Sequence, residues 1–349
     1  ILFLIIVFSN FLFAQKNQTF TICSIEAKSG EKVSGSLIVE EGIDEGTFIP
    51  ITIINGAKSG PILTLFAGIH GTEYVPIVTL QKLLNEISPN ELSGTLILVH
   101  VANIPAFNNR NAYYSQIDNK NLNRIFPGKK DGTISERIAY TLTNEIINIS
   151  DYYIDLHGGE FNEQIVDYVY FYYGCPDSDI CKKSRMLAHA IGNKYLIPWK
   201  FDEVPDSEQA TYTDVVAFRL GAAVITNEWG DLGVVKPKEL EIAKKGLINV
   251  MRTIKMLEGE YFVNNNPVYL LDEKYIKSNY DGIFYPLVEK AQFVTHGTLL
   301  GYTTDYWGKI IEEYNSPFNG IVVHIKISPT IKKGDSPVRV AKVVDKFDE

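Results

Sequence analysis

The spacing of hydrophobic and polar positions changes several times along the chain, and each spacing predicts one type of element. Apolar and polar side chains alternate over residues 32–40 and 47–54, as in strands with one buried face. Continuous apolar runs, which are typical of strands buried on both faces, cover residues 61–68, 94–101, 152–156 and 222–226. Helices with one apolar face are predicted at 72–87, 135–149 and 237–257, with Thr72 and Ser135 as their first residues.

This alternation of strands and helices predicts an α/β domain over residues 47–262. Residues 103–128 interrupt it with a segment rich in Asn, Tyr and turn residues. A connection of that length is usually functional or disordered, and its composition favours function. After Pro267 the pattern changes to short strands separated by Gly and Pro turns. We therefore predict a separate small all-β domain over residues 267–345.

The first residues form an apolar run, Ile1 to Phe13, that is too short to span a bilayer. Small and polar residues follow around Ala14, as signal peptidase requires. We interpret residues 1–14 as a secretory signal peptide, with a buried strand or a membrane anchor as the alternative. The protein is then expected to be exported, periplasmic or extracellular, with N-terminal strands over residues 15–46. No later segment is apolar for long enough to form a transmembrane helix, so we expect no stable membrane insertion after cleavage.

The overall charge narrows the range of partners. A formal net charge of −9 and a pI near 5.3 argue against nucleic acid. In an oxidising compartment, Cys175 and Cys181 could close a small loop, although two free thiols fit the sequence equally well.

Polar clusters follow three of the predicted buried strands. They are HGTE at residues 70–73, His157 within DLHGG, and Glu228 within NEWGD. Ligands of open α/β sheets bind at the carboxyl ends of the strands, so these clusters predict one shared site.

His70, Glu73 and His157 have the chemistry of a zinc site. Neutral imidazole and carboxylate are proper zinc ligands, and two His with one Glu leave a position for water. Either His alone is as readily explained as a structural residue, whereas the three together favour a metal. Asp155 precedes His157 by two positions, shares its side of the strand, and is predicted to orient a ligand from outside the coordination shell.

Glu228 is the candidate general base and acid. A carboxylate beside zinc can take a proton from water and pass it to a leaving nitrogen. The alternative is a structural Glu paired with an arginine. The four remaining histidines have no partner motif and are interpreted as structural; they are His100, His189, His296 and His324.

Residues 103–128 contribute the candidate substrate contacts Arg110, Asn123 and Arg124. Arg binds carboxylates through two parallel hydrogen bonds, and a donor near zinc can stabilise a developing oxyanion, which is the role predicted for Arg124. Arg124 lies between apolar residues and is expected to be partly buried. Arg110 is nearly as well explained as a solvated loop residue.

In this order, GIHGTE, DNKNLNRIFPG, SERIA, IDLHGG and TNEWG resemble the succinylglutamate desuccinylase/aspartoacylase family of the zinc carboxypeptidase-like superfamily. The resemblance implies a three-layer α/β/α domain with a mixed sheet, one zinc ion per chain, and a small barrel-like β domain. By resemblance, His70, Glu73 and His157 match the metal ligands, and Glu228 matches the catalytic glutamate. Asn123 and Arg124 match a substrate-contacting pair.

The C-terminal region looks like that family's β domain, with YDGIFYP and SPFNGIVV resembling two halves of a lipoyl-like barrel. No Lys stands in the turn where a lipoyl or biotinyl carrier needs one, so the region is interpreted as structural or as a rim that narrows access.

The sequence thus predicts a zinc-dependent hydrolase that cleaves the amide bond of a small N-acylated substrate. A metallocarboxypeptidase acting on peptides or cell-wall fragments is the first alternative. An exported binding protein without activity is the second.

Overall fold

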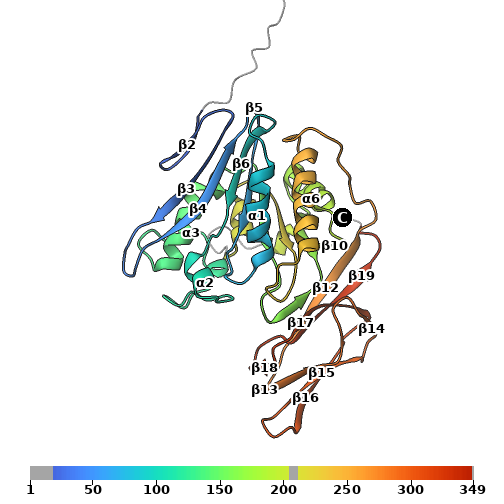
Figure 1. The fold of residues 1–349 in the computed structure, drawn as a ribbon. Helices are drawn as coiled ribbons and strands as arrows, with labels where there is room; N and C mark the ends of the chain where they lie inside the picture. The colour runs from blue at the N-terminus through green and yellow to red at the C-terminus, as the bar shows by residue number, and fades with distance from the viewer. Residues whose placement is uncertain (1–18, 204–210, 348–349) are drawn as a thin grey trace, which may run out of the picture.

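The structure is a computed structural model that describes residues 19–203 and 211–347 (Figure 1). The predicted signal peptide, residues 1–14, lies outside the described residues. Within the described part of the chain, no helix combines the length and the apolar character needed to cross a membrane.

Strands and helices alternate through the larger part of the chain, as the sequence pattern predicts. In chain order the elements are β1 Phe20–Ile22, β2 Ile25–Ala27, β3 Glu31–Val39, β4 Thr47–Asn55, β5 Lys58–Ala67, α1 Tyr74–Glu86, β6 Ser93–Val99, α2 Ile104–Asn108, η1 Leu122–Arg124, α3 Ile134–Glu145, η2 Ile147–Ile149, β7 Tyr152–His157, β8 Glu163–Ile165, β9 Tyr168–Tyr173, α4 Ser178–Ile191, β10 Tyr195–Lys200, η3 Phe201–Glu203, α5 Thr213–Arg219, β11 Ala223–Glu228 and α6 Pro237–Thr253.

Both predicted helix starts are displaced. The N-cap of α1 is Glu73 rather than Thr72, and α3 begins at Ile134 with Thr133 as its N-cap, ahead of Ser135. The side chain of Glu136 decides the second case, because its Oε2 accepts hydrogen bonds from the backbone nitrogen and the hydroxyl of Thr133 at 2.9 and 3.1 Å.

The central sheet is mixed. Its strands run in the order β14-β17-β19-β12-β10-β9-β11-β7-β5-β6-β4-β3, and the first four of this order belong to the C-terminal region. The core of the sheet is parallel, because β7 pairs in parallel with both β5 and β11. Both β4 and β9 pair antiparallel with a neighbour.

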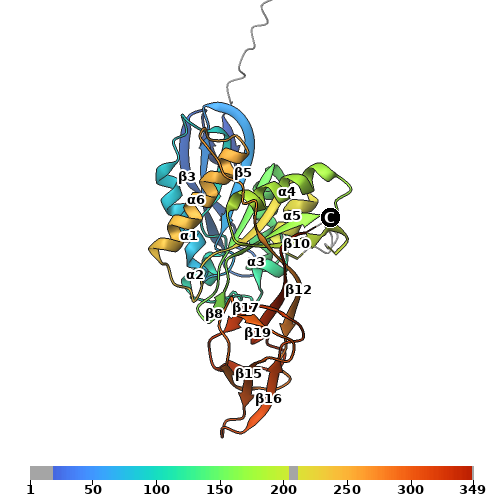
Figure 2. The ribbon, with the colours of Figure 1, turned by 90° about the vertical axis from the view of Figure 1, so that its right-hand side faces the viewer.

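Helices cover both faces of the sheet, which confirms the expected three-layer α/β/α architecture (Figure 2). On one face, α1, α4 and α6 bury an apolar layer that includes Leu80, Leu187 and Leu247. On the other, α3 and α5 bury a second layer that includes Leu142 and Val216.

After α6 the described chain forms strands only, as predicted. They are β12 Val268–Ile276, β13 Gly282–Pro286, β14 Phe293–Val294, β15 Leu299–Thr304, β16 Ile310–Asn315, β17 Gly320–Lys326, β18 Thr330–Ile331 and β19 Val338–Val344. A small antiparallel sheet, β16-β15-β13-β18, stands apart at one end of the molecule (Figures 1 and 2).

The C-terminal region is also joined to the central sheet. β12 pairs in parallel with β10, and β17 pairs antiparallel with β8. Hydrogen bonding therefore crosses the boundary placed near residue 265, and the exact division into domains stays a prediction. Within the α/β part of the chain, Cys175 after β9 and Cys181 in α4 form a disulfide, which decides between the two alternatives left open by the sequence.

Candidate active site

The three polar clusters meet because three neighbouring strands end at the same edge of the sheet. β5, β7 and β11 are adjacent and parallel. Glu228 on β11 lies opposite His157 on β7. Leu156 on β7 lies opposite Ala67 on β5, and Ala67 comes three residues before His70 in the chain. The structure therefore brings the three clusters together at the carboxyl ends of these strands.

Two glycines permit the close approach of the loops that follow these strands. A Cβ on Gly71 would lie 2.4 Å from backbone atoms of Ala106, and one on Gly158 would lie 2.3 Å from the carbonyl oxygen of Trp229. The backbone nitrogen of Gly71 also donates to the carbonyl oxygen of Asn111 at 3.1 Å. Any side chain at these two positions would collide with the neighbouring backbone. Glycine therefore allows the close loop packing that holds the adjacent residues His70 and His157 in place.

The side chains of His70, Glu73 and His157 converge in the structure. Nδ1 of His70 lies 2.7 Å from Oε1 of Glu73, and Nδ1 of His157 lies 2.9 Å from Oε2 of the same carboxylate. All three residues are buried, with at most 5% of their surface exposed. Burial alone would raise the pKa of Glu73, but His70 and His157 outweigh it and lower that pKa to about 2.

Asp155 contacts the His157 ring on the side away from Glu73. Its Oδ2 lies 3.2 Å from Nε2 of His157, the ring nitrogen that faces away from Glu73. Burial opposes a charge on His157, but Asp155 and Glu73 together raise its pKa well above the usual value. Asp155 is itself fully buried, and among the described residues its contact with His157 is an ion pair rather than a hydrogen bond.

This donor set fits a zinc ion. One ligand atom from each of His70, Glu73 and His157 lies within 4.8 Å of the others. Two imidazoles and a carboxylate leave a coordination position for water. Metal-bound histidines usually have a carboxylate on their second ring nitrogen, as Asp155 provides for His157.

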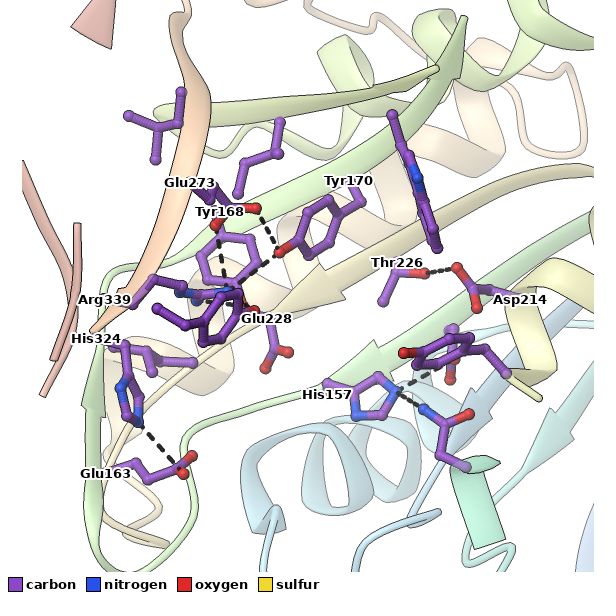
Figure 3. A pocket seen from close by; sticks show the side chains of 18 of the residues that line it. His157, Glu163, Tyr168, Tyr170, Asp214, Thr226, Glu228, Glu273, His324 and Arg339 are labelled. Atoms are coloured by element: carbon purple, nitrogen blue, oxygen red, sulfur yellow. Dashed lines mark hydrogen bonds and ion pairs between the residues drawn. The ribbon is translucent and has the colours of Figure 1, made fainter. Parts of the chain in front are cut away.

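Glu228 enters the same cavity from the end of β11. The cavity holds about 880 Å³ and is lined by Glu228, the three candidate ligands, and residues of the C-terminal strands. Figure 3 shows the Glu228 carboxylate between Arg339 and His157. Burial raises the pKa of Glu228 to about 8 against the opposing effect of His157, so this carboxyl group can exchange a proton near neutral pH.

The loop residues are not all brought to the site. Asn123 is buried with its Nδ2 3.5 Å from Nε2 of His157, and Arg124 lines the cavity with its guanidinium 4.5 Å from the ring centre of Tyr212. Arg124 is exposed rather than partly buried, because Leu122 and Phe126 point inward and Arg124 points outward between them.

Arg110 is exposed, has a left-handed backbone conformation, and is not among the residues that line the cavity. The structure therefore gives its predicted role in substrate binding no support.

The C-terminal strands contribute wall residues that the sequence pattern does not reveal. His324, interpreted above as structural, lines the cavity with its Nε2 3.3 Å from Oε1 of Glu163. Arg339 is buried on β19 and donates to the hydroxyls of Tyr168 and Tyr275 at 2.7 and 2.8 Å. No local motif marks these residues, because only the pairing of β12 and β17 with the central sheet brings them here.

Comparison with protein families decides the affiliation of the chain. The model of the succinylglutamate desuccinylase/aspartoacylase catalytic domain matches residues 59–254. The chain belongs to this family. The matched range contains every residue of the candidate metal site together with Glu228, and the resemblance inferred from the motifs is confirmed.

Relatives cover nearly the whole chain. The N-alpha-acetyl-L-2,4-diaminobutyric acid deacetylase of Halomonas elongata is 28% identical over 303 residues, which are 85% of this chain and 86% of that protein. A succinylglutamate desuccinylase from Silicibacter sp. TM1040 superposes with a TM-score of 0.80 at 26% identity, covering 92% of this chain and 98% of the other.

The product-bound ectoine utilization protein EutE (DoeB) from Ruegeria pomeroyi also superposes with a TM-score of 0.80, at 27% identity and over 94% of this chain and all of that one. The expected fold, a mixed α/β sheet with a small C-terminal antiparallel sheet, is thus confirmed among family structures. As a member of this deacylase family, the chain is a hydrolase of an amide C–N bond with a His-Glu-His metal site.

Proposed function

We propose that the protein is a zinc-dependent deacylase that removes the acyl group from a small N-acylated amine, with Glu228 as general base and acid. The observation that carries this proposal is the placement of Glu228 in the same cavity as His70, Glu73 and His157. Zinc held by these three residues supplies a Lewis acid and a water of lowered pKa.

Glu228 moves the proton in this scheme. Its carboxylate takes a proton from the attacking water as the water oxygen bonds to the acyl carbon. It then gives that proton to the amide nitrogen as the C–N bond breaks, which leaves a carboxylate and a free amine. Burial, which raises its pKa to about 8, suits a group that must both accept and return a proton.

Asn123 and Arg124 are proposed to position the acyl amide. Asn123 contacts His157, and both Asn123 and Arg124 line the cavity, so an amide and a guanidinium donor are available near the candidate metal site. The Nη1 of Arg124 donates to the carbonyl oxygen of Asn123 at 2.6 Å and so holds the pair together.

The first candidate substrate is an Nα-acetylated diamino acid, because the Halomonas elongata relative is a deacetylase of N-alpha-acetyl-L-2,4-diaminobutyric acid. Sequence identity of 28% leaves room for a different acyl group or amine. We also propose that the protein acts outside the cytoplasm, on the strength of the apolar run that ends near Ala14.

The test is to assay zinc-loaded protein and its Glu228→Gln variant with Nα-acetyl-L-2,4-diaminobutyrate. We expect turnover to fall at least about a hundredfold in the variant while one zinc per chain remains bound, because Glu228 is not a ligand. Release of acetate is followed by a coupled assay, and zinc by mass spectrometry. Near-normal turnover in Glu228→Gln would rule out the proposed mechanism.

Glu163→Gln is the matched control. Glu163 lines the same cavity, but its Oε1 already accepts a hydrogen bond from Tyr113 at 2.7 Å and faces His324. We expect this variant to retain more activity than Glu228→Gln. Peptides are assayed in parallel, since release of free amino acids instead of carboxylic acids would favour a carboxypeptidase.

A further inference from the structure

Asp214 is a cavity carboxylate that the proposed mechanism does not use. It stands in the first turn of α5, is 5% exposed, and lines the cavity that contains Glu228. Figure 3 shows it on the side of the cavity opposite Arg339, with its side chain directed toward Thr226. No motif in the sequence singles it out.

Only one of the two carboxylate oxygens of Asp214 accepts hydrogen bonds from the described residues. The hydroxyls of Tyr172 and Thr226 both donate to its Oδ2, each at 2.8 Å. Among the described residues, Oδ1 accepts no hydrogen bond and neither oxygen has an ion pair. Residues 204–210, which lie outside the described range, contain no Lys or Arg.

Two other carboxylates of the cavity have a basic side chain within ion-pair distance. Glu273 lies 3.3 Å from Nη1 of Arg339, and Glu163 lies 3.3 Å from the imidazole of His324. Burial raises the pKa of Asp214, and the Asp155 carboxylate raises it further, against the opposing effects of Tyr172, Thr226 and His157. A buried carboxylate without a counter-ion is costly, and a bound cation would remove that cost.

The strand register places Thr226, the hydrogen-bond partner of Asp214, near the reaction centre. On β11, Thr226 comes two residues before Glu228. On the neighbouring strand β7, the residue opposite Thr226 is Asp155, which comes two residues before His157. Two residues along a strand span about 7 Å. An acyl carbon and an amino group separated by the backbone of a diamino acid span about 6 Å when extended. The spacing from Thr226 to Glu228 along β11 is therefore similar to the spacing of the two groups in the substrate.

We propose that Asp214 binds the ammonium group of the substrate and makes the enzyme selective for N-acylated compounds that carry a second amino group. This inference rests on the proposed deacylase function and adds the residue that selects the substrate. The carboxylate supplies one charge-assisted hydrogen bond through Oδ1, while Tyr172 and Thr226 hold Oδ2 in place.

The experiment compares Nα-acetyl-L-2,4-diaminobutyrate with Nα-acetyl-L-norvaline, in which a methyl group replaces the ammonium. For the diamino substrate, we expect Asp214→Asn to lower kcat/KM at least about thirtyfold, chiefly through KM. For the norvaline derivative, we expect a change of less than about threefold, because the uncharged side chain makes no ion pair. The Asn side chain still accepts hydrogen bonds from Tyr172 and Thr226, and melting temperature checks the fold.

Glu273→Gln is the matched control, because Glu273 lines the same cavity but is paired with Arg339. We expect this variant to keep the wild-type ratio of kcat/KM between the two substrates. A parallel loss on both substrates in Asp214→Asn would show a structural role instead and overturn the proposal. Equal kcat/KM of the wild-type protein on both substrates would overturn it as well.

Calorimetry separates this inference from the proposed function. L-2,4-diaminobutyrate and L-norvaline are titrated into zinc-loaded wild type and Asp214→Asn. The ammonium site is supported if the diamino acid binds more tightly than norvaline to the wild type but not to Asp214→Asn. This holds even if neither acetylated compound is hydrolysed and the proposed function fails. Equal affinities in both proteins would refute the site, whatever the activity.

Discussion

At the residue scale, the site depends on carboxylates that act through a neighbour. Oδ2 of Asp155 lies 3.2 Å from Nε2 of His157, and we expect this contact to hold the ring with Nδ1 toward Glu73. Its spacing of two from His157 makes this role visible in the sequence, because alternate residues of a strand share a face. Asp214 has no such spacing signal, and only the fold reveals that it lacks a counter-ion.

Asp155→Asn is expected to weaken zinc binding about 10- to 100-fold, because an amide holds the His157 ring less firmly than a carboxylate does. Competition with a chromogenic chelator measures the dissociation constant. Asp151→Asn is the control: this residue immediately precedes the same strand, and its Oδ2 accepts a hydrogen bond from the backbone of Ile62. Equal zinc affinity in wild type and Asp155→Asn would contradict the orienting role.

At the element scale, α3 shows why helix starts are hard to place from sequence. Thr133 and Ser135 are both good N-cap residues, and the position of Glu136 selects Thr133. Ser135 is used otherwise, since its hydroxyl donates to Asp118 at 2.9 Å. That contact joins α3 to the loop 103–128, whose later part forms η1 with Asn123 and Arg124.

Glu136→Gln tests the start of α3 through its pH dependence. The hydrogen bond from Lys120, followed by that from the Thr133 backbone, lowers the pKa of Glu136 to about 2 from an ordinary 4.5. The unfolded chain therefore binds a proton more readily, so the stabilisation is complete above about pH 4.5 and disappears as the pH falls toward 2.

We expect the variant to lose roughly 1 kcal/mol of unfolding free energy at pH 7 and progressively less below pH 4.5. Urea denaturation at several pH values measures it. Glu41→Gln, at an exposed carboxylate, provides the reference. A difference that stays constant between pH 7 and pH 3 would contradict the assignment.

At the scale of the whole molecule, the C-terminal strands complete the catalytic cavity. β19 carries Arg339 to the side of Glu228, and β17 carries His324 to Glu163. From the sequence, this region is interpreted as structural or as a rim that narrows access. The structure adds that this rim is charged and buried, with Arg339 stabilised by the hydroxyls of Tyr168 and Tyr275.

Arg339→Gln is expected to move the acidic limb of the kcat/KM profile to higher pH. The guanidinium lowers the pKa of Glu228, so its removal raises that pKa, and a base that must be ionised then loses activity at a higher pH. The midpoint of the limb does not depend on the amount of folded protein. Lys342→Gln, on the same strand and paired with Asp272, serves as control. A limb that moves to lower pH, or not at all, would contradict the prediction.

The sequence by itself determined the chemistry of the site and the class of fold. Apolar runs located β5, β7 and β11, and the residues that end them, His157 and Glu228, kept their predicted places. Such runs can be recognised from a few consecutive residues, because a strand buried on both faces must be apolar throughout. Several elements escaped prediction, among them β9, because its tyrosines line a cavity and give no clear period.

Only the tertiary structure decided which distant residues share the cavity. Arg110 is adjacent to the motif region in sequence and yet stays outside, whereas Arg339, more than two hundred positions further on, lies within. The physical reason is that strand pairing and burial are set by the whole sheet. The lack of a counter-ion at Asp214 likewise depends on every side chain around it, and no local pattern encodes it.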